Sequence, residues 1–214
     1  MPAPRSPEIR DTYDERLNRI LEAATSLIAS EGYGNASMRA VARVAGVSLA
    51  GLYHYFDSKE KMLFLIQFRT FSSLLARLRE NLHGVADPVE QLRVLVRTHV
   101  AHFAHDMAAL NVCSHELDSL REDAYDEVFR VRHEYYDLAR GIVDRILERH
   151  GGGRNFDGHI AVMSLFGTLN WLYRWYDPKQ GRSVGTVANQ ITEQFLTGIL
   201  GRAPAARPEP AAGG

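Results

Sequence analysis

The sequence has one cysteine, no long apolar run and almost no net charge. With Cys113 alone among 214 residues, no internal disulfide can form, which fits a reducing compartment. No run of about 18 apolar residues is present to span a bilayer, and the start, MPAPRSPEIRDTYDER, lacks the apolar core of a signal peptide. We therefore expect a cytoplasmic protein with no membrane partner. The formal net charge of −1 means that any DNA site must be a local patch.

The motifs of common enzymes are missing as well. The chain has no G-x-S-x-G, no H-E-x-x-H, no phosphate-binding loop and no paired Glu-x-x-His set. Cys113 has no recognisable catalytic partner and is expected to be a buried, inert thiol. His115 and Glu116 are adjacent, so they point to different sides of a helix. We predict no catalytic residue and no cofactor, and hence not an enzyme.

Helical signals fill most of the chain. The first helix has an apolar face of Leu17, Ile20, Leu21, Ala24, Leu27 and Ile28. No alternating strand pattern appears, so the predicted fold class is all-α. Longer helices are predicted over residues 58–83, 88–106, 108–120, 123–149, 158–176 and 184–200. We expect a disordered arm over residues 1–13, a helix-turn-helix domain over 14–57, a larger helical domain over 58–201 and a disordered Ala/Pro/Gly-rich tail over 202–214.

Two short helices meet at a sharp break inside residues 40–62. Ser37 can cap the first of them, Gly46 ends it and Ser48 caps the next at once. This is the helix-turn-helix arrangement, in which the second helix can enter a DNA major groove. Leu52 and Phe56 share a face and are predicted to lie in the core. The alternative is an ordinary helical hairpin, and local charge does not decide, because eight basic and eight acidic side chains balance over residues 1–62.

The same segment resembles the N-terminal domain of the tetracycline-repressor (TetR) family of bacterial transcription regulators. The resemblance covers residues 14–62 and is carried by Ile20-Leu21-Glu22-Ala23-Ala24, Gly32-Tyr33, Ser37-Met38-Arg39, Val41-Ala42, Ala45-Gly46-Val47-Ser48, Leu52-Tyr53-His54-Tyr55-Phe56 and Ser58-Lys59-Glu60. It implies a DNA-binding domain followed by a helical ligand-binding and dimerisation domain. It also implies repression that a small molecule relieves.

The resemblance assigns DNA contacts by position. Ser37, Arg39 and Lys59 are similar to phosphate contacts, and Tyr53 and His54 to phosphate or base-edge contacts. The groove-facing start of the recognition helix corresponds to Ser48, Leu49, Ala50 and Gly51. The family often has Gly at position 50 and Thr, Ser or Ala at 51, whereas this chain has Ala50-Gly51. Gly51 costs about 1 kcal/mol of helix stability against Ala and leaves no side chain to contact a base.

Two C-terminal segments have the apolar surface that a dimer needs. The segment 158–176 is apolar nearly all round, and the segment 184–200 has one apolar stripe. If each meets its copy across a two-fold axis, the resulting homodimer matches a palindromic double-stranded DNA operator. The alternative is that both stripes belong to the core of a single chain.

The segment Asn170-Trp171-Leu172-Tyr173-Arg174-Trp175-Tyr176-Asp177-Pro178 resembles TetR regulators of lipid degradation that respond to fatty acyl-CoA. Arg174 can pair with a phosphate, and Trp171 or Trp175 can stack on adenine. The resemblance implies a small apolar effector such as an acyl-CoA, with ligand-binding residues Phe103, Leu110, Phe129, Phe166, Asn170, Trp171, Arg174 and Trp175. The alternatives are that these aromatic residues pack in the dimer interface, or that the effector is a drug-like or aromatic compound, as for regulators of efflux or catabolic genes.

Three histidines follow one another at intervals of three residues. His99 and His102 could share a metal ion, but His99 and His105 are six apart and a third fixed ligand is not evident. We therefore predict no metal site. The simpler interpretation is a polar helix face that forms one edge of a ligand pocket.

Overall fold

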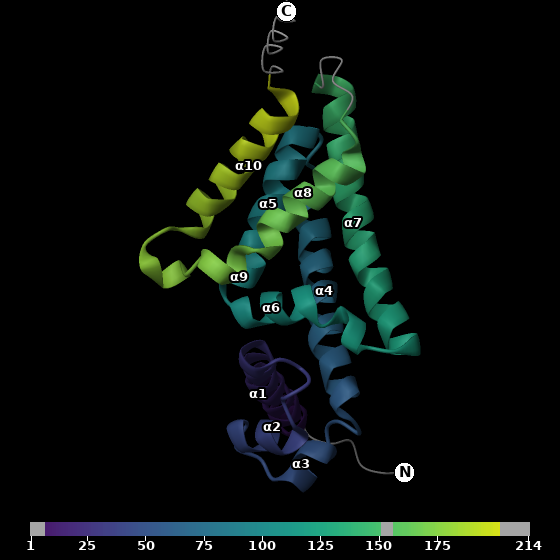
Figure 1. Cartoon of the computed structure of the whole chain (residues 1–214), viewed down its shortest axis with the longest axis vertical. Helices are drawn as coiled ribbons and strands as arrows, with labels where there is room; N and C mark the ends of the chain where they lie inside the picture. The colour runs from purple at the N-terminus through teal and green to yellow at the C-terminus, as the bar shows by residue number, and fades with distance from the viewer. Residues whose placement is uncertain (1–6, 151–155, 202–214) are drawn as a thin grey trace, which may run out of the picture.

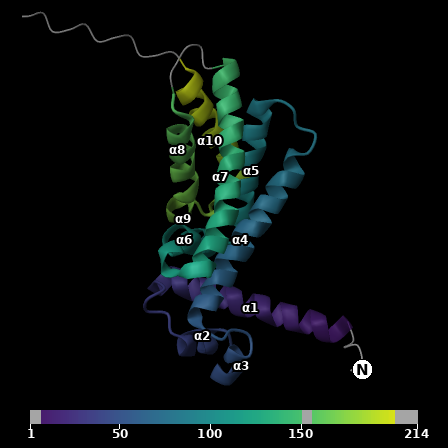
Figure 2. The same cartoon turned by 90° about the vertical axis from the view of Figure 1, so that its right-hand side faces the viewer.

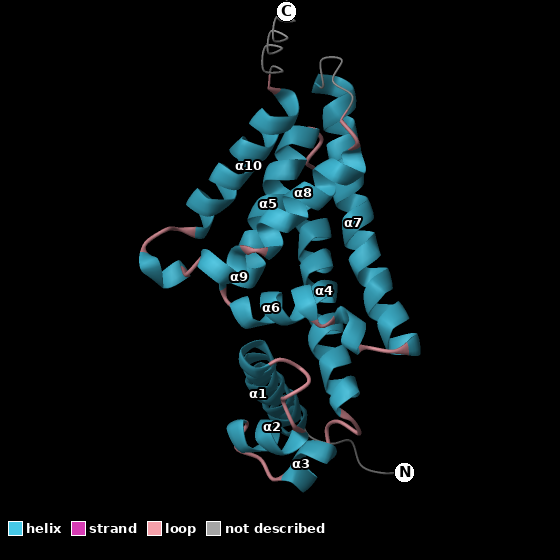
Figure 3. Cartoon of the chain, in the orientation of Figure 1, coloured by secondary structure: helices cyan, strands magenta, loops and turns pink. Residues whose placement is uncertain are grey.

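The computed structural model describes residues 7–150 and 156–201, and every regular element within these ranges is a helix (Figure 3). In chain order the helices are α1 (Pro7–Glu31), α2 (Met38–Val44), α3 (Leu49–Tyr53), α4 (Lys59–Leu82), α5 (Pro88–Ala104), α6 (Met107–His115), the 3-10 turn η1 (Leu117–Ser119), α7 (Glu122–His150), α8 (Gly158–Asn170), α9 (Leu172–Trp175), the 3-10 turn η2 (Pro178–Gln180) and α10 (Val184–Leu200). The predicted all-α fold class is confirmed for these residues.

The molecule is elongated, and α1 to α3 form one end of it (Figures 1 and 2). Helix α4 leaves this end and runs into a bundle in which it packs against α5 and α7, while α10 packs along α5 and α8 along α7. Helix α6 lies across the junction, where it contacts both α1 and α4. The pictures therefore place α6 between the helix-turn-helix end and the bundle (Figure 1).

The helix-turn-helix end has its own hydrophobic core. Leu52 and Phe56 are 0% and 1% exposed, so the prediction that they face inward is confirmed. The first turns of α4 supply Met62 and Leu63 to the same core, which also receives Val112, Leu120 and Val128 from α6, the following loop and α7. The helix-turn-helix unit is therefore packed directly on elements of the bundle.

Helix α1 begins at Pro7, inside the segment 1–13 that was expected to be disordered. Tyr13 stacks on Tyr55 with ring centroids 4.9 Å apart, so the early part of α1 packs against the segment that follows α3. Residues 1–6 and the predicted tail over 202–214 lie outside the described residues.

Two predicted helices are interrupted, and tertiary contacts explain both interruptions. The predicted helix 158–176 divides at Trp171 into α8 and α9, where Arg174 N–H donates to the Trp171 carbonyl three residues back. A bond between residues three apart is that of a tighter, 3-10 turn. With this turn in place, both Leu169 and Leu172 are fully buried. The predicted helix 108–120 ends at His115, because the polar groups of Glu116 bind other parts of the chain.

None of the helices in the described ranges is long and apolar enough to cross a membrane.

Candidate nucleic-acid interface and ligand pocket

Side-chain caps define the turn between α2 and α3. Ser37 Oγ accepts the Ala40 N–H at 3.1 Å, and Ser48 Oγ accepts the Gly51 N–H at 3.0 Å. Gly46 lies between them with φ of +66°, a left-handed conformation that side chains other than glycine rarely adopt. The predicted caps and the predicted glycine turn are confirmed. They fix the start of α3 at Leu49, three residues after Gly46.

The outer surface of α2 and α3 carries most of the residues predicted to contact DNA. Arg39 on α2 and Tyr53 and His54 at the end of α3 are exposed. Ser37, Ser48 and Ala50 are exposed as well, whereas Leu49 and Gly51 are half-buried. Because both helices lie at the free end of the molecule, this surface is open to a large partner (Figure 1).

Lys59 is half-buried, and its side chain is held by contacts within the protein. Its Nζ donates to the Gly34 carbonyl at 3.3 Å and lies 4.2 Å from the centre of the Tyr33 ring. Burial lowers the pKa of this ammonium group. Lys59 therefore fastens the start of α4 to the turn between α1 and α2, and a phosphate would have to compete with these contacts.

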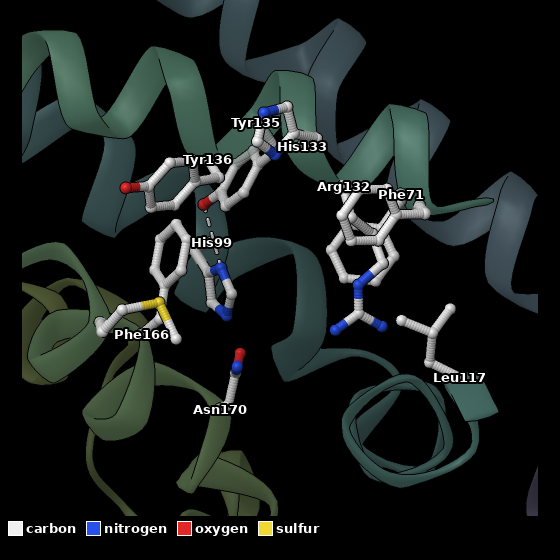
Figure 4. Close-up of a pocket in the computed structure, with 11 residues that line it drawn as sticks. Phe71, His99, Leu117, Arg132, His133, Tyr135, Tyr136, Phe166 and Asn170 are labelled. Carbon is white, nitrogen blue, oxygen red and sulfur yellow. Dashed lines mark hydrogen bonds between the residues drawn. The ribbon is translucent and has the colours of Figure 1, made fainter. Parts of the chain in front are cut away.

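The bundle contains a pocket of about 260 Å³ between α4, α5, α7 and α8 (Figure 4). Its lining is largely aromatic and consists of Phe71, His99, Leu117, Phe129, Arg132, His133, Tyr135, Tyr136, Met163, Phe166 and Asn170. Within it, Phe166 stacks on Tyr135 with ring centroids 5.4 Å apart. A concave, mostly apolar site with a few convergent polar groups is typical of small-molecule binding.

Three of the eight residues predicted to bind the ligand line this pocket, namely Phe129, Phe166 and Asn170. Phe103 and Leu110 are each 1% exposed and belong to the packed core instead. Trp171, Arg174 and Trp175 are exposed and are not among the residues that line the pocket. The Arg174 guanidinium lies 5.9 Å from the Trp171 ring.

His99 is the most deeply buried polar residue of the pocket. It is 2% exposed, and its Nδ1 lies 3.1 Å from the Tyr135 hydroxyl, which holds the ring in place. Its Nε2 is buried and has no hydrogen-bond partner among the described residues. Burial lowers the pKa of His99 to about 3, so its imidazole is neutral at physiological pH. Burial also raises the pKa of Tyr135, whose hydroxyl stays protonated.

Arg132 brings a positive charge to the same pocket. Its Nη1 donates to the Cys113 carbonyl at 2.7 Å, and its guanidinium lies 4.7 Å from the Phe71 ring. No carboxylate forms an ion pair with it in the described ranges. Sequence reasoning missed this residue, although a signal was available. Arg132 occupies a position in the buried stripe of α7 between Val128 and Tyr135.

The three histidines of the predicted polar face lie in different surroundings. His99 is buried, His102 is half-buried with a pKa lowered by burial to about 4, and His105 is exposed. No group of three or more His, Cys, Asp or Glu in the described part of the chain is placed to hold a metal ion. Burial also raises the pKa of Cys113 to about 12, so its thiol is protonated and unreactive.

Glu116 joins the pocket end of α6 to the helix-turn-helix unit. One carboxylate oxygen accepts the Tyr33 N–H at 3.1 Å, and the other accepts the Ser119 hydroxyl at 2.8 Å. Its backbone carbonyl accepts the buried Gln67 amide at 2.9 Å. The next residue, Leu117, lines the pocket. Glu116 therefore lies one residue from the pocket and also holds the turn that precedes α2.

Helix α6 is held on both sides by similar bonds. The Asn111 side-chain amide donates to the Ala29 carbonyl of α1 at 3.1 Å, and Arg132 holds the Cys113 carbonyl from the pocket side. Helix α6 is therefore bonded to α1 on one side and to a pocket residue on the other.

An exposed apolar stripe runs along α8 and continues past its end. Ile160 is 65% exposed, Met163 50%, Trp171 55% and Trp175 49%. Exposed apolar side chains at this spacing are typical of a binding surface, and one of them, Met163, also lines the pocket.

Comparison with known proteins agrees with this architecture. Residues 20–66 match the model described as bacterial regulatory proteins of the tetR family, and residues 85–199, more than half of the chain, match the tetracyclin repressor-like C-terminal domain. The chain thus belongs to the TetR family of DNA-binding transcription regulators, and the prediction that it is not an enzyme is confirmed.

Particular relatives are distant but cover most of the chain. The transcriptional repressor KstR2 of Rhodococcus jostii is 26% identical over 86% of this chain and 91% of its own length. The fatty acid metabolism regulator protein of Bacillus subtilis is 23% identical over 85% of this chain and 94% of its own length. The crystal structure of AibR in complex with isovaleryl coenzyme A and operator DNA matches with a TM-score of 0.72 at 24% identity, over 86% of this chain and 98% of that chain, which is a likeness of fold.

Proposed function

We propose that this regulator is a homodimeric repressor that a small apolar effector, a fatty acyl-CoA or a related thioester, releases from a palindromic operator. The observation that carries the proposal is the mainly aromatic pocket whose lining residue Arg132 is bonded to α6, the helix that is itself bonded to α1. A ligand in that pocket has a short physical route to the DNA-binding surface. The cytoplasm is the compartment where such a repressor acts.

The DNA half of the proposal rests on the exposed surface of α2 and α3. Arg39, Tyr53 and His54 offer a guanidinium, a hydroxyl and an imidazole to phosphates and base edges. Two copies of α3 must lie about 34–36 Å apart to enter successive major grooves. Lys59 contributes a phosphate contact only if DNA displaces it from Gly34 and Tyr33.

The dimer half rests on the stripe of α8. Ile160, Met163 and Trp171 expose apolar side chains that a second copy of α8 would bury, with α10 beside it. In this arrangement Trp171 and Trp175 serve the interface, which is the alternative role considered from the sequence. The pocket lies behind the same helix, so effector binding and the spacing of the two DNA-binding ends are physically linked.

The nature of the effector is supported by two relatives and by the pocket itself. One relative is named as a regulator of fatty acid metabolism, and another was crystallised with an acyl-CoA thioester. The pocket, of about 260 Å³ and with a largely apolar lining, can accommodate an acyl chain. Asn170 lines the pocket at the end of α8, and Arg174 lies one turn further on at the surface. With an acyl group inside the pocket, the CoA moiety would extend out over the surface on which Arg174 lies.

The mechanism is a shift between two populated arrangements of the dimer. Effector binding favours the arrangement in which α6 is displaced and the two α3 helices are wrongly spaced for DNA. The aromatic lining also suits the second candidate effector, an aromatic or drug-like compound, because rings can stack on Phe129, Tyr136 or Phe166.

A ligand series distinguishes the two effectors. Thermal unfolding is followed with acyl-CoA thioesters of increasing chain length and, in parallel, with a panel of aromatic compounds. We expect the rise in Tm to increase with acyl chain length until the chain fills the pocket. Phe166→Trp fills part of the pocket and should remove the rise, whereas the matched Phe195→Trp on α10 should preserve it. Stabilisation by aromatic compounds alone would favour the second candidate.

A further inference from the structure

The pocket contains two polar groups that the fold satisfies only in part. His99 Nε2 is buried without a partner among the described residues, and the half-buried Arg132, which donates to the Cys113 carbonyl, forms no ion pair in the same ranges. A buried donor without a partner reduces stability, and so does a charge held away from water without an ion pair. Groups that reduce stability in this way are commonly retained because a ligand uses them.

These two groups face the same space. In Figure 4 the Nε2 edge of His99 points toward the side-chain amide of Asn170, and the guanidinium of Arg132 is directed toward the same part of the pocket. The rest of the lining is largely aromatic or aliphatic. A ligand here therefore meets a polar corner and otherwise an apolar surface.

We propose that this polar corner binds the carbonyl oxygen of the effector, with Arg132 and His99 as donors and Asn170 as the third polar contact. The inference rests on the proposed function, in which an acyl group occupies this pocket. Its ligand class is an apolar chain that ends in an oxygen acceptor, either the thioester of an acyl-CoA or the carboxylate of a free fatty acid. A hydrocarbon or thioether of the same length lacks the recognised atom.

The protonation states fit this assignment. The Tyr135 hydroxyl can donate to His99 Nδ1, and the neutral ring then carries its proton on Nε2, where it can donate to an oxygen. Arg132 uses Nη1 for the Cys113 carbonyl and retains further N–H groups for the ligand. Because that carbonyl belongs to α6, the residue that binds the effector oxygen also contacts the helix that must move.

The test compares two ligands that differ by one oxygen atom. Octanoyl-CoA and its thioether analogue S-octyl-CoA are titrated into the full chain by calorimetry, with octanoate as a third probe. We expect octanoyl-CoA to bind about 10- to 100-fold more tightly than S-octyl-CoA, the factor that hydrogen bonds to a charged donor supply. Octanoate binding as tightly as the thioester would identify the carboxylate as an equal source of the recognised oxygen.

Variants assign the preference to the polar corner. Arg132→Met and His99→Phe should each make the affinities for octanoyl-CoA and S-octyl-CoA more nearly equal. Arg130→Met changes an exposed arginine two positions away on α7 and should leave the preference for octanoyl-CoA unchanged. Equal affinity of wild-type protein for thioester and thioether would overturn the oxygen contact while leaving the pocket as the effector site. Binding of neither CoA compound nor octanoate would reject the acyl effector and this inference together.

Discussion

Glu116→Ala should uncouple effector binding from DNA release, because Glu116 joins α6 to the turn before α2. The substitution removes the acceptor of the Tyr33 N–H at 3.1 Å and of the Ser119 hydroxyl at 2.8 Å, and leaves the backbone bond from Gln67 intact. A hydrogen bond to a charged group contributes about 1.5–3 kcal/mol. Since Glu116 is half-buried and water replaces part of the lost interaction, we expect the free energy of unfolding to fall by about 2–3 kcal/mol.

Two assays test this prediction. Urea denaturation measures the stability loss against Asp126→Ala, an exposed acidic residue of α7 that should change stability by no more than about 0.5 kcal/mol. Operator affinity is then measured with and without saturating effector. In Glu116→Ala the ratio of these two affinities should approach one, while the affinity for the effector should stay within a few fold of the wild-type value. A full effector response in the variant would show that the signal does not pass through this junction.

Four further predictions concern the other surfaces. Tyr53→Ala should weaken operator binding at least tenfold in an electrophoretic shift assay and leave effector affinity unchanged; equal DNA affinity would remove Tyr53 from the interface. Arg174→Ala should weaken octanoyl-CoA in calorimetry much more than octanoate, and equal losses would mean that Arg174 does not contact the CoA phosphates. Ile160→Glu should convert the dimer to monomer in sedimentation, whereas an unchanged mass would refute the α8 interface. His99 binds a proton more readily in the unfolded chain, because its folded pKa is lowered from 6.5 to about 3. Stability should therefore fall below pH 6.5, with His99 contributing up to about 1.4 kcal/mol per pH unit in addition to the share of His102, whose pKa burial also lowers. An equally steep fall between pH 6.5 and 5 in His99→Gln would refute the assignment.

Local signals predicted the helix-turn-helix end well. The caps Ser37 and Ser48 and the turn glycine Gly46 act through bonds to residues at most five positions away, so the sequence alone determines them. The start of α5 is equally local, since Asp87 accepts the Glu90 N–H at 3.0 Å. Elements fixed by such short-range bonds can be read directly from residue order.

Features set by distant parts of the chain escaped prediction. The end of α6 depends on bonds from Glu116 to Tyr33 and Gln67, which lie 83 and 49 residues away. The break at Trp171 depends on the packing of its neighbours rather than on a glycine or proline. Arg132 was missed because its role needs the pocket, which four helices build together. Trp171, Arg174 and Trp175 were placed with the effector from a short resemblance, and the fold puts all three at the surface.

The central claim is that an acyl effector in the pocket releases this regulator from its operator. Fluorescence anisotropy on DNA from upstream of its own gene, at two salt concentrations and with or without octanoyl-CoA and a long-chain acyl-CoA, tests it most directly. We expect salt-sensitive, sequence-specific binding that a thioester abolishes. Specific binding that persists unchanged in the presence of saturating thioesters would contradict it.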